Sequence, residues 1–161
     1  MKLLSVDPGK HVGFATWEFG LGEPILLKMG VTKNENEFYD ILINDDWLTF
    51  GYLVYEDYKI RPAKVNKGWS HEWNSAPALH VIGALELFAR QNGIELKEQP
   101  ASILPVGCGY INFPYRKGVH VPNNVSAIAH GAYWLVKNKY ANSRGFKVLT
   151  SEPTKDGVKG S

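Results

Sequence analysis

The chain has little cysteine, little net charge and no long apolar run. Cys108 is the only cysteine among 161 residues, which excludes an internal disulfide and a site built from several thiolates. No apolar segment approaches the roughly 20 residues that a membrane-spanning helix needs. The opening MKLLSVDPGK has one lysine before its apolar run, and that run is too short for a secretory signal. We therefore expect a cytoplasmic protein with no membrane span.

The chain also has little excess of one charge sign over the other, because 18 Lys and Arg residues nearly balance 16 Asp and Glu residues. The formal net charge of +2 does not by itself indicate nucleic-acid binding. Cations are nevertheless concentrated in KIRPAKVNK, residues 59–67, which holds four of them and no anion, and a second pair occurs at Arg116 and Lys117. These stretches are either solvated loops or two parts of a phosphate-binding surface.

What is present fits an ordinary globular protein, with 44% hydrophobic and 21% charged residues. A length of 161 residues accommodates one domain with a substantial core. We expect that domain to span residues 1–150. The polar ending SEPTKDGVKGS, residues 151–161, is expected to be a disordered tail.

Apolar patterns and turn residues predict a mixed α/β order of three strands, helix, strand, helix, strand and helix. Pro-Gly and Gly-rich turns between the first three strands indicate an antiparallel meander. Residues 101–109 are either a helical turn or a loop, and the Gly-, Pro- and Asn-rich stretch 107–123, which includes Cys108, is expected to be a loop. The expected strands are 3–6, 12–19, 25–31, 52–55 and one within 93–100. Three helices are expected: one of about ten residues within 34–48, a second at 72–92 and a third at 125–139.

Two acidic residues follow apolar strands. Asp7 ends the first strand in SVDPG, and Glu56 ends the fourth in YLVYED. If these strands are neighbours, the two carboxylates converge at one edge of the sheet, where they repel each other unless a cation lies between them. Mg²⁺ prefers such oxygen ligands. The alternative is ordinary turn chemistry, because Asp before Pro-Gly and Glu at a strand end are both common.

The last expected helix carries a polar stripe. Asn123, Ser126 and His130 are spaced at i, i+3 and i+7, opposite the apolar face of that helix. Such a stripe is usually the solvent side, and a single histidine in it is more often structural than a ligand. The alternative is that the stripe completes a site with Asp7 and Glu56.

Four segments then resemble, in order and spacing, the RuvC-type Holliday junction resolvases, especially their phage-encoded relatives. They are SVDPGKHVGFAT, YLVYEDY, WNSAPALHVIGALELFARQNGIELKEQPAS and HVPNNVSAIAHGAYWLV, within residues 1–140. The resemblance implies a ribonuclease H-like fold, in which an antiparallel three-strand meander continues into parallel strands and helices flank the mixed sheet. It implies a homodimer that cuts opposed strands of a four-way DNA junction with Mg²⁺ or Mn²⁺. Asp7 and Glu56 match two of the family's metal-binding residues.

One departure from the family concerns the final helix. The family pattern opens with an acidic residue or histidine, followed after two residues by an aspartate before alanine, where this chain has Asn123 and Ser126. Both positions are candidate metal ligands, but neither side chain brings negative charge, so metal binding should be weakened. Three explanations remain: a natural variant that recruits His120 or His130, a deliberately inactivated protein, or a junction-binding protein that no longer cuts.

The resemblance also implies a DNA-binding surface and partners. Tyr58 is placed to stack on an unpaired base, Trp69 stacks on DNA or packs the dimer, and residues 77–88 form the expected self-association face. We expect branched DNA and a second copy of the chain as partners, no small-molecule organic cofactor, and the cytoplasm of a bacterial host if the protein is phage-encoded. A related nuclease for RNA–DNA hybrids is a further alternative. The cations expected to contact phosphates are Lys59, Arg61, Lys64, Lys67, Arg116 and Lys117.

Overall fold

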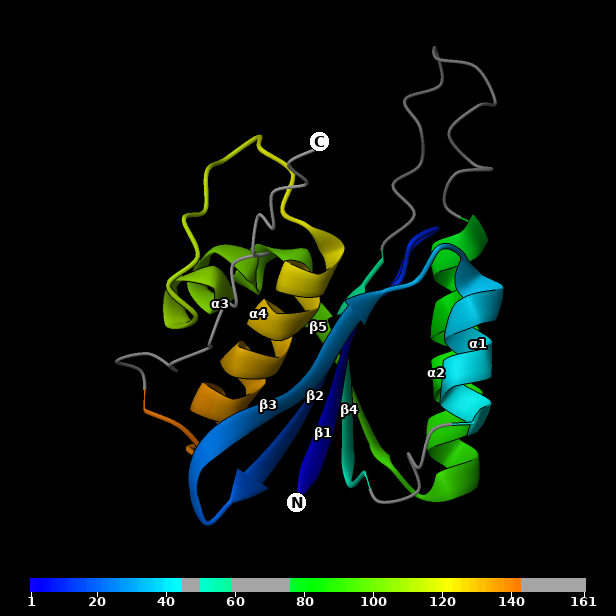
Figure 1. Cartoon of the computed structure of the whole chain (residues 1–161), viewed down its shortest axis with the longest axis horizontal. Coiled ribbons are helices and arrows are strands. Elements are labelled where there is room, and N and C mark those ends of the chain that lie inside the picture. The colour runs from blue at the N-terminus through cyan, green and yellow to red at the C-terminus, as the bar shows by residue number, and fades with distance from the viewer. Residues whose placement is uncertain (45–49, 59–75, 143–161) are drawn as a thin grey trace, which may run out of the picture.

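The computed structural model describes residues 1–44, 50–58 and 76–142. The expected tail at 151–161 lies outside the described residues. Five strands and four α-helices, with one short 3₁₀ helix, make up the described chain (Figure 1). They are β1 (Lys2–Asp7), β2 (Gly13–Gly20), β3 (Gly22–Val31), α1 (Glu35–Asn44), β4 (Tyr52–Asp57), α2 (Ala76–Asn92), β5 (Glu95–Pro100), the 3₁₀ helix Ala101–Ile103, α3 (Leu104–Tyr110) and α4 (Asn123–Lys137).

The strands form one mixed sheet in the order β3-β2-β1-β4-β5. β1, β2 and β3 pair antiparallel, whereas β4 pairs parallel with β1 on one side and with β5 on the other. The predicted meander and the predicted parallel strands are therefore both confirmed. Because β1 and β4 are neighbours, their carboxyl ends lie at the same edge of the sheet.

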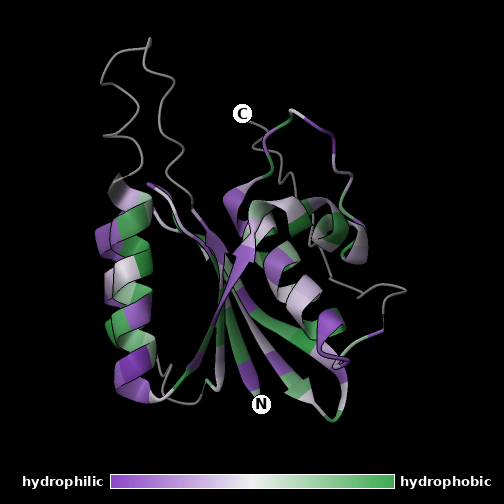
Figure 2. Ribbon diagram, turned by 180° about the vertical axis from the view of Figure 1, so that it is seen from behind, coloured by the Kyte–Doolittle hydropathy of each residue, from purple (hydrophilic) through white to green (hydrophobic). Residues whose placement is uncertain are grey.

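Helices cover both faces of the sheet. α1 and α2 lie on one face, and α3 and α4 lie on the other (Figure 1). Strand residues alternate between two cores, as a pleated strand requires: Leu4 and Leu53 pack on the α1/α2 side, whereas Leu3 and Val54 pack on the α3/α4 side. Figure 2 shows the apolar strand residues between these two helical layers.

Helix ends follow local signals in the sequence. The backbone N–H of Glu37 donates to Asn34 Oδ1 at 3.0 Å, so Asn34 caps α1. α2 is followed by Gly93 in the left-handed region, with φ of 64°, as expected for a helix that ends at a glycine. The predicted start of that helix at residues 72–75 lies outside the described residues. In the described part of the chain, no helix is both long and apolar enough to cross a membrane.

The expected loop at 107–123 is wrong over its first four residues, because α3 continues to Tyr110. Cys108 is therefore a buried helical residue of the α3/α4 core. A side chain at Gly107 would collide with the backbone carbonyl of Ala129 in α4. Glycine here allows two helices to pack closely, so a composition typical of loops belongs to a helix.

The last helix also differs from expectation. α4 begins at Asn123, two residues before the predicted start, and Ser126 and His130 are buried, with relative exposures of 2% and 0%. Of the two alternatives for this polar stripe, the solvent-facing one is therefore excluded at Ser126 and His130, whereas Asn123 is half-buried. α4 packs against β1, β2 and β4, so its polar stripe lies over the sheet.

Candidate active site

The strand pleat places Asp7 and Glu56 on the same face of the sheet. Val6 of β1 is paired with Tyr55 of β4, so Asp7 and Glu56 follow at the same end of the two strands. Leu3 and Val54 face the α3/α4 core, and each carboxylate is an even number of residues further along its strand. Both carboxylates therefore lie on the α4 face. The strands β1 and β4 end at the side of the sheet where α4 begins (Figure 1).

α4 adds two buried polar side chains beside Glu56. The Ser126 hydroxyl donates to Glu56 Oε2 at 3.4 Å, and His130 Nε2 lies 3.0 Å from the same oxygen. Ser126 also interacts with the side chain of Asp7, which lowers the pKa of that carboxyl, so Ser126 acts on both members of the acidic pair. Two of the three members of the polar stripe are thus brought to the acidic pair.

Gln99 is a member of the cluster that the sequence reasoning missed. It lies on β5 opposite Glu56 of β4, and its side chain is buried, with a relative exposure of 6%. Gln99 Oε1 lies 2.7 Å from His130 Nδ1. The sequence feature that could have indicated Gln99 is its place as a polar residue near the end of a strand expected to run parallel to the strand of Glu56. A glutamine there is too common to stand out.

The electrostatics of the acidic pair are unbalanced. Burial raises the pKa of the Asp7 carboxyl, the charge of Glu56 raises it further, and the hydrogen bond with Ser126 lowers it, which together give a pKa of about 7. Two facing carboxylates show this shift when no cation neutralises them. The pair therefore favours either a proton or a bound cation.

The other predicted residues lie around this cluster. Asn123 Nδ2 donates to the backbone carbonyl of His11, which holds the start of α4 against the turn after β1. His120, Arg116 and Lys117 are exposed in the connection between α3 and α4, which rises above the start of α4 (Figure 1). Tyr58 is exposed directly after β4. Lys59, Arg61, Lys64, Lys67 and Trp69 lie outside the described residues.

The donor set fits a single hard cation. In residues 1–44, 50–58 and 76–142, no group of three or more His, Cys, Asp and Glu side chains is arranged to hold a metal ion. Asp7 and Glu56 supply two carboxylates, and Ser126 supplies a hydroxyl that interacts with both. Mg²⁺ and Mn²⁺ accept such oxygen ligands, and Mg²⁺ keeps several waters when few protein ligands are offered. The residues fit one such ion better than two.

A close approach of α4 to the sheet keeps the cluster in place. A side chain at Gly131 would collide with Trp17 Nε1 and Ser5 Oγ. These two atoms are themselves hydrogen-bonded at 3.3 Å. The next residue along α4 from His130 is therefore in direct contact with β1 and β2, which fixes the height of α4 above the acidic pair.

Replacing Gly131 by alanine should lower the free energy of unfolding by about 2 kcal/mol, because the added methyl group overpacks a rigid contact. Gly83→Ala is the matched control, since Gly83 is an exposed residue inside α2 and a side chain there meets nothing. That change should stabilise the protein by up to about 1 kcal/mol. Urea unfolding followed by circular dichroism measures both. Equal effects of the two changes would contradict the close packing.

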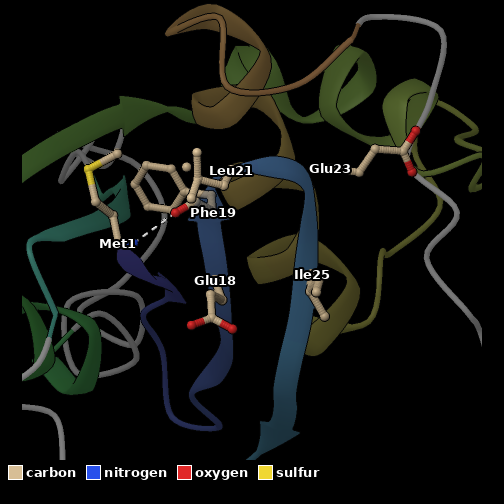
Figure 3. A pocket seen from close by; sticks show the side chains of 7 residues that line it. Met1, Glu18, Phe19, Leu21, Glu23 and Ile25 are labelled. Carbon is tan, nitrogen blue, oxygen red and sulfur yellow. Dashed lines mark hydrogen bonds between the residues drawn. The ribbon is translucent and has the colours of Figure 1, made fainter.

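A hollow of about 510 Å³ lies at the opposite end of β1 from Asp7. Met1, Phe19, Leu21 and Ile25 line it together with two glutamates, at the turn between β2 and β3 (Figure 3). The N-terminal amine of Met1 donates to the carbonyl of Phe19 at 2.8 Å (Figure 3). The hollow is therefore separate from the acidic pair and from the residues that hold it.

Comparison with known proteins gives a fold but no sequence family. No family model and no curated protein matches the sequence. The structure is similar to that of Thermus thermophilus RuvC in complex with a Holliday junction substrate, with a TM-score of 0.58 and 13% identity over 88% of this chain and 98% of that chain. It is also similar to a second Thermus thermophilus RuvC structure, with a TM-score of 0.56 and 15% identity over 88% of this chain and 99% of that chain. The chain therefore has a RuvC-like fold, a mixed five-stranded sheet flanked by helices.

Proposed function

We propose that this protein is a structure-selective endodeoxyribonuclease that cuts four-way junctions and other branched DNA by metal-dependent hydrolysis of a phosphodiester. The observation that carries the proposal is the placement of Asp7 and Glu56 on one face of neighbouring strands, beneath the start of α4. Support comes from the RuvC-like fold, because one structure that shares it holds a Holliday junction.

In this proposal Asp7 and Glu56 hold Mg²⁺ or Mn²⁺. When bound, the ion supplies a more acidic water and stabilises negative charge on the phosphate. Ser126 and His130 orient Glu56 through its Oε2 atom. The α4 start and the turn after β1 are joined by Asn123, so both sides of the acidic pair are held relative to each other.

The DNA surface in this proposal lies at the same end of the sheet. Tyr58 is exposed next to the end of β4, where it can stack on an unpaired base. Arg116 and Lys117 are exposed in the connection that precedes α4, where they can neutralise phosphates. The basic stretch 59–67 follows Tyr58 directly in the sequence, which extends the same surface in the proposal.

A homodimer is the proposed assembly, because two opposed cuts require two sites. Leu79 and Leu87 on α2 are exposed, with relative exposures of 38% and 57%, which supports the 77–88 face as the contact between copies.

Leu87→Glu should shift the mass measured by analytical ultracentrifugation from a dimer to a monomer. Leu21→Glu is the control, since Leu21 is fully exposed at the turn between β2 and β3. A dimer that survives Leu87→Glu places the contact elsewhere.

A protein that binds junctions without cutting them is the second candidate. The observation that favours it is the neutral pair Asn123 and Ser126 at positions where the resemblance leads us to expect acidic ligands. Asp7 and Glu56 then shape the site and bind a cation without supporting hydrolysis.

Cleavage of labelled substrates separates the two candidates. We expect nicks in a four-way junction with Mg²⁺ or Mn²⁺, far fewer in a matched linear duplex or an RNA–DNA hybrid, and none with EDTA. Glu56→Gln should abolish the nicks while junction binding is retained. Glu98→Gln, which changes an exposed residue of β5, should leave cleavage unchanged. Tight junction binding without nicks at any concentration of either ion would favour the binding protein.

A further inference from the structure

A connected chain of three side chains lies between α4 and the strands β4 and β5 at the acidic site. Gln99 on β5 contacts His130 on α4, and His130 contacts Glu56 on β4, at 2.7 and 3.0 Å. His130 is fully buried and Gln99 nearly so, whereas the Glu56 side chain is 23% exposed. The chain therefore runs from the protein interior to a carboxylate that solvent reaches.

The contacts to Glu56 fall on one of its two oxygens. In the described part of the chain, the hydrogen bonds from Ser126 and His130 to this carboxylate both involve Oε2. An ion that is bound through one carboxylate oxygen then takes Oε1, because Oε2 is already engaged by two partners. These two contacts restrict rotation of the carboxylate before the ion binds. Binding the ion then costs less conformational entropy.

Gln99 controls the histidine in this arrangement. Its side-chain oxygen contacts Nδ1, and this contact fixes the plane of the imidazole ring and the direction of Nε2. Gln99 itself lies opposite Glu56 in the β4–β5 pairing, so the register of these two strands positions both residues that contact His130. A register slip or the loss of the Gln99 side chain would therefore change the position of Glu56 through the histidine that both side chains contact.

We infer that Gln99 and His130 are positioning residues that hold Glu56 by Oε2 and so prepare the site for a divalent cation. The inference deepens the proposed function and rests on the metal site within it. It assigns a role to two residues buried beneath the site, and it predicts that metal affinity depends on a glutamine that does not itself bind the metal.

Direct Mn²⁺ binding, measured by electron paramagnetic resonance of free Mn²⁺ without DNA, tests the inference. Gln99→Leu keeps the size of the side chain and removes its amide. We expect it to weaken Mn²⁺ binding roughly tenfold, as loss of an outer contact to a ligand typically does. The midpoint of thermal unfolding serves as the check on folding. Gln91→Leu, at an exposed position of α2, is the matched control and should bind Mn²⁺ as the unchanged protein does.

If Gln99→Leu does not fold, Gln99→Met, with an unbranched side chain, replaces it. Mn²⁺ affinity of a folded variant within twofold of the unchanged protein would overturn the inference, even if the protein cuts junctions. Weakened Mn²⁺ binding in a protein that cuts no DNA would support the inference while the proposed hydrolysis fails. No Mn²⁺ binding by the unchanged protein would overturn both.

Discussion

Replacing Ser126 by aspartate should tighten Mn²⁺ binding at least tenfold and make folding depend on the ion. The hydroxyl of Ser126 contacts Glu56 and interacts with Asp7, so an aspartate there adds a third carboxylate to the pair. Without a cation, three neighbouring and partly buried carboxylates repel each other and lose hydration, which should lower the free energy of unfolding by roughly 3 kcal/mol. With Mn²⁺, the extra ligand should more than recover that loss.

Thermal unfolding with EDTA and with 5 mM Mn²⁺, about the concentration range in which weak sites fill, measures both effects. Ser126→Ala is the control, because it removes the hydroxyl without adding charge. It should lower stability by about 1 kcal/mol in both conditions. Adding Asn123→Asp tests whether the start of α4 supplies a further ligand. If Ser126→Asp is no more dependent on Mn²⁺ than Ser126→Ala, residue 126 does not lie at an ion site.

Asp7→Asn should stabilise the protein at pH 8 without divalent ions and abolish Mg²⁺-dependent cleavage. The pKa of Asp7 is about 7 in the folded protein, against 3.8 for an unperturbed carboxyl. The folded state therefore binds the proton more tightly than the unfolded state. As the pH rises from about 4 to about 7, the unchanged protein loses stability, and the loss is complete above pH 7. Asparagine has no such loss, which should be worth about 2 kcal/mol at pH 8 after allowance for solvent near the site.

Urea unfolding between pH 4 and pH 9 checks this prediction. The curve for Asp7→Asn should be flatter than that of the unchanged protein, and Mg²⁺ should stabilise only the unchanged protein. Asp40→Asn, at an exposed position of α1, should reproduce the unchanged curve. A loss of stability in Asp7→Asn at pH 8 would mean that the charged carboxylate is already compensated within the protein.

The acidic pair and the sheet that carries it could be predicted from the sequence. Apolar runs that end in a carboxylate mark the ends of strands, and the period of two along a strand determines which face Asp7 and Glu56 share. The turns around the first three strands indicate a meander, and the structure confirms it. Strand ends, strand periodicity and turns are each determined by a few consecutive residues, so the sequence alone was sufficient to predict them.

The burial of Ser126 and His130 could not be predicted in the same way. A polar stripe opposite an apolar face is typical of solvent exposure, and only the packing of α4 against the sheet reverses that expectation. Gln99 was missed because its importance depends on the β4–β5 register, which the sequence does not contain locally. Gly107, which lets α3 approach α4, falls in the expected loop because the same kind of long-range packing is needed to identify its role.

Anomalous X-ray scattering from crystals grown with Mn²⁺ tests the central claim most directly. We predict a single strong peak between the carboxylates of Asp7 and Glu56 on the α4 face of the sheet. The ion should be bound by Oε1 of Glu56, while Oε2 of Glu56 remains hydrogen-bonded to His130. The peak should be absent from crystals of Glu56→Gln. A Mn²⁺ peak at another place in the fold, with Asp7 and Glu56 bound to no ion, would contradict the claim.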